Sequence, residues 1–298
     1  FGSGIYAADP EMSVLFAFAI FGIAPLGVFF AGWSSNNKYS LLGGIRSAAQ
    51  LTAYEIPLLI TILSVCVLSG SLNIIEIIDF QYGSGVWNFF LIPLGSLLFL
   101  VTMIAEVERI PFDMPEAEAE LVEGWWTEYG GMRWGLLFAS EYLRCYAACI
   151  LMAHFFFGGY HAPFANFIGD LGAFGDAYLA IPGIVWVLLK AWFFFAIFVW
   201  VRAAFPRIRT DQILELGWKY LLPLSLINLA FAFILRLYVF DGNSWGPGSG
   251  MIIPAAITLI SLILFVVLSV DEDPDWEGQR MSHTRTVTPA GTHTIGED

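Results

Sequence analysis

The chain has 298 residues, of which 58% are hydrophobic and only 13% are charged, and its mean hydropathy is +0.72. This composition excludes a water-soluble globular domain and predicts a protein surrounded by lipid. The net charge of −13 excludes the basic surface of a nucleic-acid-binding protein, so no nucleic acid is expected as a partner.

Seven apolar runs follow one another along the chain, each near the length of about 20 residues that a membrane-spanning helix needs. They cover residues 12–32, 56–72, 87–105, 134–157, 181–201, 220–240 and 251–270. Open sheet edges cannot exist in hydrocarbon, and the runs lack the alternation of lipid-facing barrel strands. The sequence therefore predicts an all-α, polytopic helical bundle over residues 1–270, followed by an acidic, disordered tail over residues 271–298.

Basic residues fall on alternate loops of this bundle. The expected loops 33–55, 106–133 and 202–219 hold eight Lys and Arg residues, whereas the intervening loops and the first eleven residues hold none. Because basic loops stay in the cytoplasm, we expect the N-terminus outside and the tail inside. The chain begins with Phe1 and shows no signal-peptide pattern, as expected for a fragment of a longer protein. The low pI, about 4.6, fits either adaptation to high salt or a solvating terminus.

The loop after the third run is strongly acidic and reads AEVERIPFDMPEAEAELVEGWWTEYGG over residues 105–131. If it is helical from Pro115, several carboxylates share one face and repel one another. Repulsion raises carboxyl pKa values toward the working pH unless Arg109, Arg133 or water compensates the charges. A solvated loop is the alternative interpretation. The eight acids are Glu106, Glu108, Asp113, Glu116, Glu118, Glu120, Glu123 and Glu128.

Several ionisable residues lie inside the expected spans, where a charge is costly. Glu141 is expected about 10 Å inside its helix, and Arg144 at i+3 can pair with it. Lys190 lies near the middle of its span, and Glu55 opens the second span. Structural packing is the alternative for each, but several buried charges in one small bundle favour a proton or ion path.

Redox and metal chemistry have no sequence signature here. The three cysteines fall in apolar runs, the four histidines form no ligand pattern, and there is no nucleotide-binding glycine motif or cluster-binding cysteine set. We expect no cofactor to be bound by this chain alone.

Three stretches together resemble the quinone-site membrane subunit of respiratory complex I, the subunit 1 family. They are GWSSNNKYSLLGGIRSAAQLTAYEIPL at residues 32–58, AEVERIPFDMPEAEAELVEGWWTEYGGMRWGLLFASEY at residues 105–142, and VRAAFPRIRTDQILELGWKYLLPL at residues 201–224. The resemblance implies a membrane subunit of a proton-translocating NADH-quinone oxidoreductase that frames a tunnel for an isoprenoid quinone, ubiquinone or menaquinone. It implies two kinds of partner: peripheral-arm subunits, which hold iron–sulfur clusters and for which flavin is a further candidate cofactor, and antiporter-like membrane subunits. It also implies a location in the inner (cytoplasmic) membrane of a prokaryotic cell.

The same resemblance assigns roles to individual residues, none of them catalytic. To the quinone tunnel and cytoplasmic loops it assigns Arg46, Arg109, Asp113, Arg202, Arg207 and Asp211. To proton coupling it assigns Glu55, Glu106, Glu116, Glu118, Glu120, Glu128, Glu141, Tyr142 and Lys190. Four residues depart from the family pattern. Glu108 replaces the Asn common before Arg109, and Arg144 stands where a small or amide residue is usual. Thr210 replaces the usual Tyr before Asp211, and Ala53 replaces the usual Ser before Tyr54.

Two alternatives accompany this interpretation. The first is the equivalent subunit of a membrane-bound hydrogenase or formate hydrogenlyase, which shares the ancestry and uses no quinone. The second is a secondary ion transporter. Inverted repeats and paired, interrupted spans would favour a transporter, and the sequence shows neither.

Overall fold

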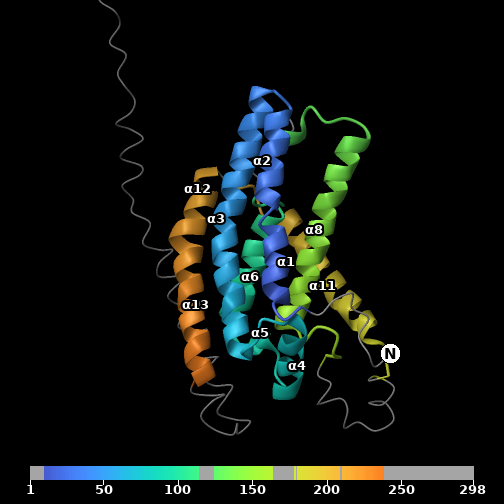
Figure 1. The fold of residues 1–298 in the computed structure, drawn as a ribbon, viewed down its shortest axis with the longest axis vertical. Helices are drawn as coiled ribbons and strands as arrows, with labels where there is room; N and C mark the ends of the chain where they lie inside the picture. Colours follow the sequence, from blue (N-terminus) through green and yellow to red (C-terminus); the bar gives the residue numbers. More distant parts are fainter. Residues whose placement is uncertain (1–9, 114–123, 164–177, 179, 209, 238–298) are drawn as a thin grey trace, which may run out of the picture.

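The computed structural model describes residues 10–113, 124–163, 178, 180–208 and 210–237. The regular elements of this part are helices (Figure 1). They are α1 (Ser13–Phe21), α2 (Ala24–Ser34), α3 (Lys38–Ser69), α4 (Ile74–Ser84), α5 (Asn88–Leu91), α6 (Pro93–Glu106), the 3-10 helix η1 (Gly124–Trp126), α8 (Met132–Phe156), α11 (Gly183–Ala204), α12 (Thr210–Glu215), the π-helix η3 (Leu216–Leu221) and α13 (Leu222–Leu235).

Five helical segments in the described residues are long and apolar enough to cross a membrane. They are Ser13–Ser34, Lys38–Ser69, Met132–Phe156, Gly183–Ala204 and Gln212–Leu235. The run expected at 87–105 is divided, because Pro93 starts a new helix after Ile92, and gives the short α5 and the 14-residue α6. The seventh expected run and the acidic tail lie outside the described residues. The all-helical, polytopic prediction is confirmed, with five candidate spans in this part of the chain.

The longest helix, α3, begins earlier than the apolar run alone predicts. Residues 38–55, expected in a loop, form its first half, and Asn37 caps it by accepting a hydrogen bond from the Tyr39 amide at 3.1 Å. Glycines let α2 and α3 approach closely here: a Cβ added at Gly32 would lie 2.8 Å from the Ser40 carbonyl oxygen. Residues 210–219, also expected in a loop, belong to α12 and η3. In both places helical packing extends past the apolar run.

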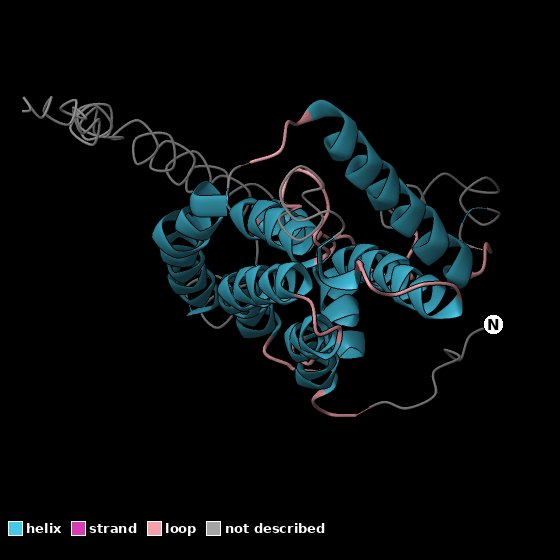
Figure 2. Ribbon diagram, turned by 90° about the horizontal axis from the view of Figure 1, so that it is seen from above, coloured by secondary structure: helices cyan, strands magenta, loops and turns pink. Residues whose placement is uncertain are grey.

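Helix α3 is the central element of the bundle (Figure 1). Figure 2 shows the bundle from above, with its helices in cyan. Helices α2, α6 and α13 pack around it, and α8 packs against α11. The largest core cluster fills the space among α3, α6, α8 and α11. We call the bottom of Figure 1, with α4, α5 and residues 157–163, the α4 end. The acidic end comprises the end of α6, residues 107–113, η1 and the first halves of α3 and α8.

Candidate functional site

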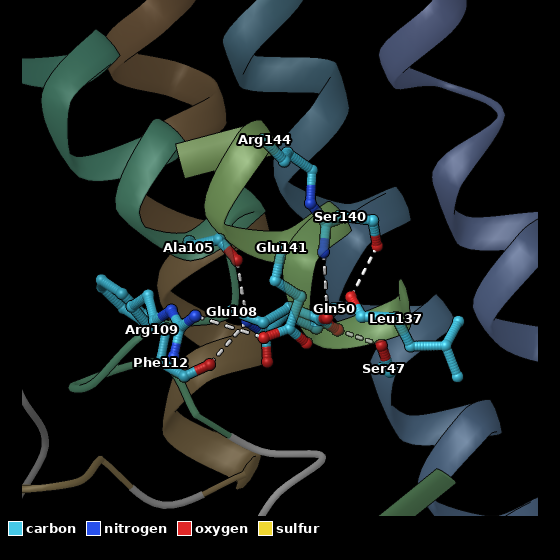
Figure 3. A network of polar contacts seen from close by, with 10 residues as sticks. All are labelled: Ser47, Gln50, Ala105, Glu108, Arg109, Phe112, Leu137, Ser140, Glu141 and Arg144. Carbon is cyan, nitrogen blue, oxygen red and sulfur yellow. Dashed lines mark hydrogen bonds and ion pairs between the residues drawn. The ribbon is translucent and has the colours of Figure 1, made fainter. Parts of the chain in front are cut away.

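A buried polar cluster lies at the acidic end, where α3, the end of α6 and α8 meet (Figure 3). Helix α6 ends at Glu106, and the chain turns through Glu108, whose φ is 56°. Gln50 on α3 holds both sides of this turn, because its Nε2 donates to the Ala105 oxygen at 2.9 Å and to the Phe112 oxygen at 2.7 Å. The turn is therefore fixed by α3. We call the following set the acidic cluster: Ser47, Gln50, Glu106, Glu108, Arg109, Asp113, Glu141 and Arg144.

Ion pairs connect the turn with the neighbouring helices. Arg109 Nη2 lies 3.3 Å from Glu141 Oε2, and Arg144 Nη2 lies 3.4 Å from Glu108 Oε2. The spacing in the sequence predicted that Glu141 and Arg144 pair along α8, but both of these bonds run from α8 to the turn. The i+3 spacing places the two side chains on one face of α8, and the turn supplies an oppositely charged group to each. The carboxylates are nearly excluded from solvent, with 7% of the Glu141 side chain and 4% of the Glu108 side chain exposed.

A third ion pair joins the turn to the segment after α11. Arg207 Nη2 lies 2.9 Å from Asp113 Oδ2, and the Ile208 amide donates to the Pro111 oxygen at 3.2 Å. Asp113 is buried while Arg207 is half exposed. Two of the stretches singled out in the sequence, residues 105–142 and 201–224, therefore meet at this point.

Glu106 differs from the other carboxylates of the acidic cluster. Only 1% of the residue is exposed, and its Oε2 has no hydrogen-bond partner among the described residues. Two further buried atoms of the cluster share this property within the described part, Gln50 Oε1 and Arg144 Nη1. An ionised carboxylate is costly in such surroundings, so this geometry favours a protonated Glu106.

Glu108 is buried and strongly influenced by its neighbours. Burial raises the pKa of its carboxyl above the ordinary value, and the nearby charge of Asp113 raises it further. The guanidinium of Arg144 and the hydroxyl of Ser47, which donates to Glu108 Oε1, act in the opposite direction. These opposing influences make the protonation of Glu108 sensitive to its charged neighbours.

An aromatic residue borders the acidic cluster. The Arg109 guanidinium lies 4.6 Å from the centre of the Tyr142 ring, a cation–π distance, and Tyr142 is 39% exposed. Tyr142 therefore connects the cluster to the surface of the bundle.

A second polar group lies one turn further along α3. Tyr54 donates to the Ile213 oxygen at 2.8 Å and packs on Phe112, with ring centres 5.5 Å apart. Glu55, half-buried, points its Oε1 at Gly22, where α1 ends. The family resemblance assigned a role to Glu55, whereas Ser47, Gln50 and Tyr54 were not predicted as part of the site. Their i, i+3, i+7 spacing on one helical face was the available signal.

The remaining assigned residues lie apart from the acidic cluster or outside the described side chains. Arg46 is half-buried on α3, and Arg202 is exposed near the end of α11. Glu128 is exposed and accepts a hydrogen bond from Asn37 Nδ2 at 2.8 Å. Asp211 lies in α12, but its side chain is outside the described part. Three residues of the acidic loop lie entirely outside the described part: Glu116, Glu118 and Glu120.

Lys190 lies at the α4 end, away from the acidic cluster. Its Nζ donates to the carbonyl oxygens of Phe157 at 2.6 Å, Gly159 at 2.8 Å and His161 at 2.8 Å. These carbonyls belong to the turn that follows α8, where helix carbonyls lack intrahelical donors. Three contacts satisfy all three protons of the ammonium group. The geometry is that of an anchor for the turn, and the predicted role of Lys190 in proton coupling stays a prediction.

Among the described residues, no group of three or more His, Cys, Asp or Glu side chains has an arrangement that could hold a metal ion. The family model described as "NADH dehydrogenase" matches residues 1–233. Salinibacter ruber has a similar protein, a subunit of NADH-quinone oxidoreductase, 44% identical over 233 residues, which are 76% of this chain and 68% of that protein. "NADH-quinone oxidoreductase subunit 8" of Rhodothermus marinus is 44% identical over 236 residues, covering 77% and 69%. An NADH-quinone oxidoreductase subunit of Geobacillus thermodenitrificans is 43% identical over 233 residues, covering 78% and 66%.

Proposed function

Because the chain belongs to the NADH dehydrogenase family of membrane subunits of NADH-quinone oxidoreductase, or complex I, we propose that it frames the quinone tunnel and that its acidic cluster couples quinone reduction to proton transfer. The chain is thus part of an enzyme complex. The hydrogenase and transporter alternatives find no support among these relatives, whose names are those of quinone oxidoreductase subunits.

The observation that supports this proposal most is the burial of acids and arginines in one cluster at the acidic end. A quinone that takes up two electrons also takes up two protons, so titratable groups must lie near its path. Iron–sulfur clusters in peripheral-arm partners supply the electrons when the complex is assembled. The acids of this chain hold and release protons beside that path.

Within the cluster, Arg109 is the residue best placed to respond to the quinone. It contacts the half-exposed Tyr142 on one side and the buried Glu141 on the other. A change of charge near Tyr142 alters the attraction between Arg109 and Glu141. Because Glu108 belongs to the same turn, the change reaches its pair with Arg144. Coupling of this kind is a free energy shared between two sites.

The partners and the location follow from the family. We propose peripheral-arm iron–sulfur subunits at the acidic end and antiporter-like membrane subunits beside the bundle, in the inner membrane of a prokaryotic cell. The acidic end would then face the cytoplasm, in agreement with the distribution of basic residues.

The decisive variant is Glu141→Gln in the intact complex. We expect quinone-dependent turnover and proton translocation to fall at least tenfold while the complex still assembles, because the amide keeps the shape and loses the charge that pairs with Arg109. Ser140→Ala, an exposed neighbour on α8, is the matched control and should leave both unchanged. Normal turnover and translocation in Glu141→Gln would remove Glu141 from the mechanism.

The tunnel itself is tested by a photoreactive quinone analogue. Labelling of this chain that excess natural quinone prevents is the expected result. Labelling confined to other subunits would contradict the tunnel assignment.

A further inference from the structure

Two buried carboxylates of the acidic cluster, Glu106 and Glu108, have unequal partners. Glu108 has an ion pair with Arg144 and a hydrogen bond from Ser47, whereas Glu106 has neither an ion pair nor a partner for Oε2 in the described part of the chain. Glu106 is 1% exposed and Glu108 is 5% exposed, so water compensates neither charge.

Arg144 is bound on one side only. Its Nη2 lies 3.4 Å from Glu108 Oε2, while Nη1 is buried without a hydrogen-bond partner among the described residues. Its charge also acts on Glu106, where it is the strongest charged influence. A guanidinium presents its donors as a rigid fork, and two carboxylates can use the two Nη groups.

We propose that Glu106 and Glu108 share one exchangeable proton and that Arg144 is the positioning residue that determines which of them holds it. In one form Glu108 is ionised against Arg144 and Glu106 holds the proton. In the other form Arg144 Nη1 donates to an ionised Glu106, and the proton lies on Glu108. The transfer breaks the O–H bond on Glu106 and forms an O–H bond on Glu108, and no other covalent bond changes. This inference rests on the proposed function and states how Glu106, Glu108 and Arg144 take part in it.

The ion pair between Glu108 and Arg144 supports the inference. Glu108 and Arg144, found separately in the sequence, are the two ends of one buried ion pair. A lone Glu at 108 would bury a second unpaired carboxylate beside Glu106, and a lone Arg at 144 would bury an unpaired cation. Each of these two buried charges is therefore compensated by the other.

Other charged and titratable groups around the pair are compensated or less buried. Arg109 pairs with Glu141, and Arg207 pairs with Asp113. Glu55 is half-buried, so water reaches part of its side chain. The groups that act on Glu106, Glu108 or Arg144 from the packed elements are Glu55 and Ser47 on α3, Asp113 in the turn and Cys145 on α8. Arg109 and Glu141 lie in the same polar network (Figure 3), where they pair with each other.

The test is the pH profile of quinone-dependent turnover in the intact complex. In Arg144→Gln the midpoint of the profile should move up by about 1 to 3 pH units, because the lost cation favours protonated carboxyls. In Glu108→Gln it should move down, because Arg144 then acts on Glu106 alone. In the double variant, which combines Arg144→Gln with Glu108→Gln, the midpoint should lie close to that of the unmodified complex, because the upward and downward shifts offset each other. Arg133→Gln, an exposed arginine on the same helix, should not move the midpoint.

Two results would overturn the inference. One is an unchanged midpoint in Arg144→Gln. The other is a double variant in which Glu108→Gln does not reverse the shift in midpoint that Arg144→Gln causes. If Arg144→Gln does not assemble, Arg144→Lys keeps the charge without the fork and should give a smaller upward shift, and Glu108→Gln tests the downward shift independently.

Glu141→Gln separates this inference from the proposed function. Loss of turnover in Glu141→Gln together with fixed midpoints in the Arg144 and Glu108 variants would overturn proton sharing and leave the proposed function in place. Normal turnover in Glu141→Gln with shifted midpoints would overturn the role of Glu141 and support proton sharing.

Discussion

Buried charged side chains have different kinds of partner at the two ends of the bundle. At the acidic end, carboxylates and guanidinium groups compensate one another in pairs, and Glu106 has no cation of its own within the described residues. At the α4 end, Lys190 is compensated by three backbone carbonyls. Backbone carbonyls do not titrate, whereas carboxylates exchange protons. The difference suggests that one end can change its charge state and the other holds the helices in place.

The strongest test of this comparison is Lys190→Met. The variant keeps the apolar stem and leaves three buried carbonyls without their donor, so the folded subunit should lose about 3 kcal/mol or more. We expect little of the chain in the assembled complex, with normal turnover in the molecules that do assemble. Native gels and turnover per assembled complex measure the two quantities.

Lys38→Met, an exposed lysine at the start of α3, is the control and should assemble normally. Full assembly of Lys190→Met with lost proton translocation would break the comparison, because Lys190 would then belong to the proton path.

A smaller loss is expected from Gln50→Leu at the acidic end. The change removes the donor from the Ala105 and Phe112 carbonyls, which costs about 1 to 3 kcal/mol and loosens the turn after α6. Hydrogen exchange of residues 105–113 should become faster, and turnover should fall with it. Thr52→Val, an exposed change on the same helix, should alter neither. Faster exchange with unchanged turnover would show that the turn geometry is not needed for activity.

The pH dependence of stability sharpens the comparison further. Burial raises the pKa of Glu108 above its ordinary value of 4.5, so the unfolded chain releases this proton at a lower pH than the folded chain does. The contribution of Glu108 to stability is therefore greatest below pH 4.5 and is lost as the pH rises through the raised pKa. The unfolding temperature of Glu108→Gln should fall less over this range than that of the unmodified complex. Parallel curves would mean that Glu108 keeps an ordinary pKa.

The helical class, the membrane setting and most of the residues that form the acidic cluster could be predicted from the sequence. The length of an apolar run and the spacing of acidic residues are properties of short stretches of sequence, so both could be recognised without the structure. The sequence could not predict that Glu141 and Arg144 bind the turn, because those partners are 32 and 36 residues away along the chain. Nor could it predict that Gln50 donates to the turn or that Lys190 donates to three carbonyls. Every residue has a backbone carbonyl, so the sequence does not indicate which carbonyls accept these hydrogen bonds.

The smallest effect is expected at the surface of the α4 end. Asp79 Oδ1 accepts a hydrogen bond from the Tyr160 hydroxyl at 2.6 Å and lies 3.5 Å from His161 Nε2, but 58% of the Asp79 side chain is exposed. Asp79→Asn should therefore change stability by about 0.5 kcal/mol or less near pH 7. Burial lowers the pKa of His161 below 6.5 and Asp79 opposes this, so the variant should lose slightly more stability than the unmodified chain as the pH falls below 6.5. Unfolding curves at pH 7 and pH 5.5 measure both effects. A large loss of turnover in Asp79→Asn would instead mean that protons are handled at this end as well, and the distinction between an exchanging end and an anchoring end would have to be abandoned.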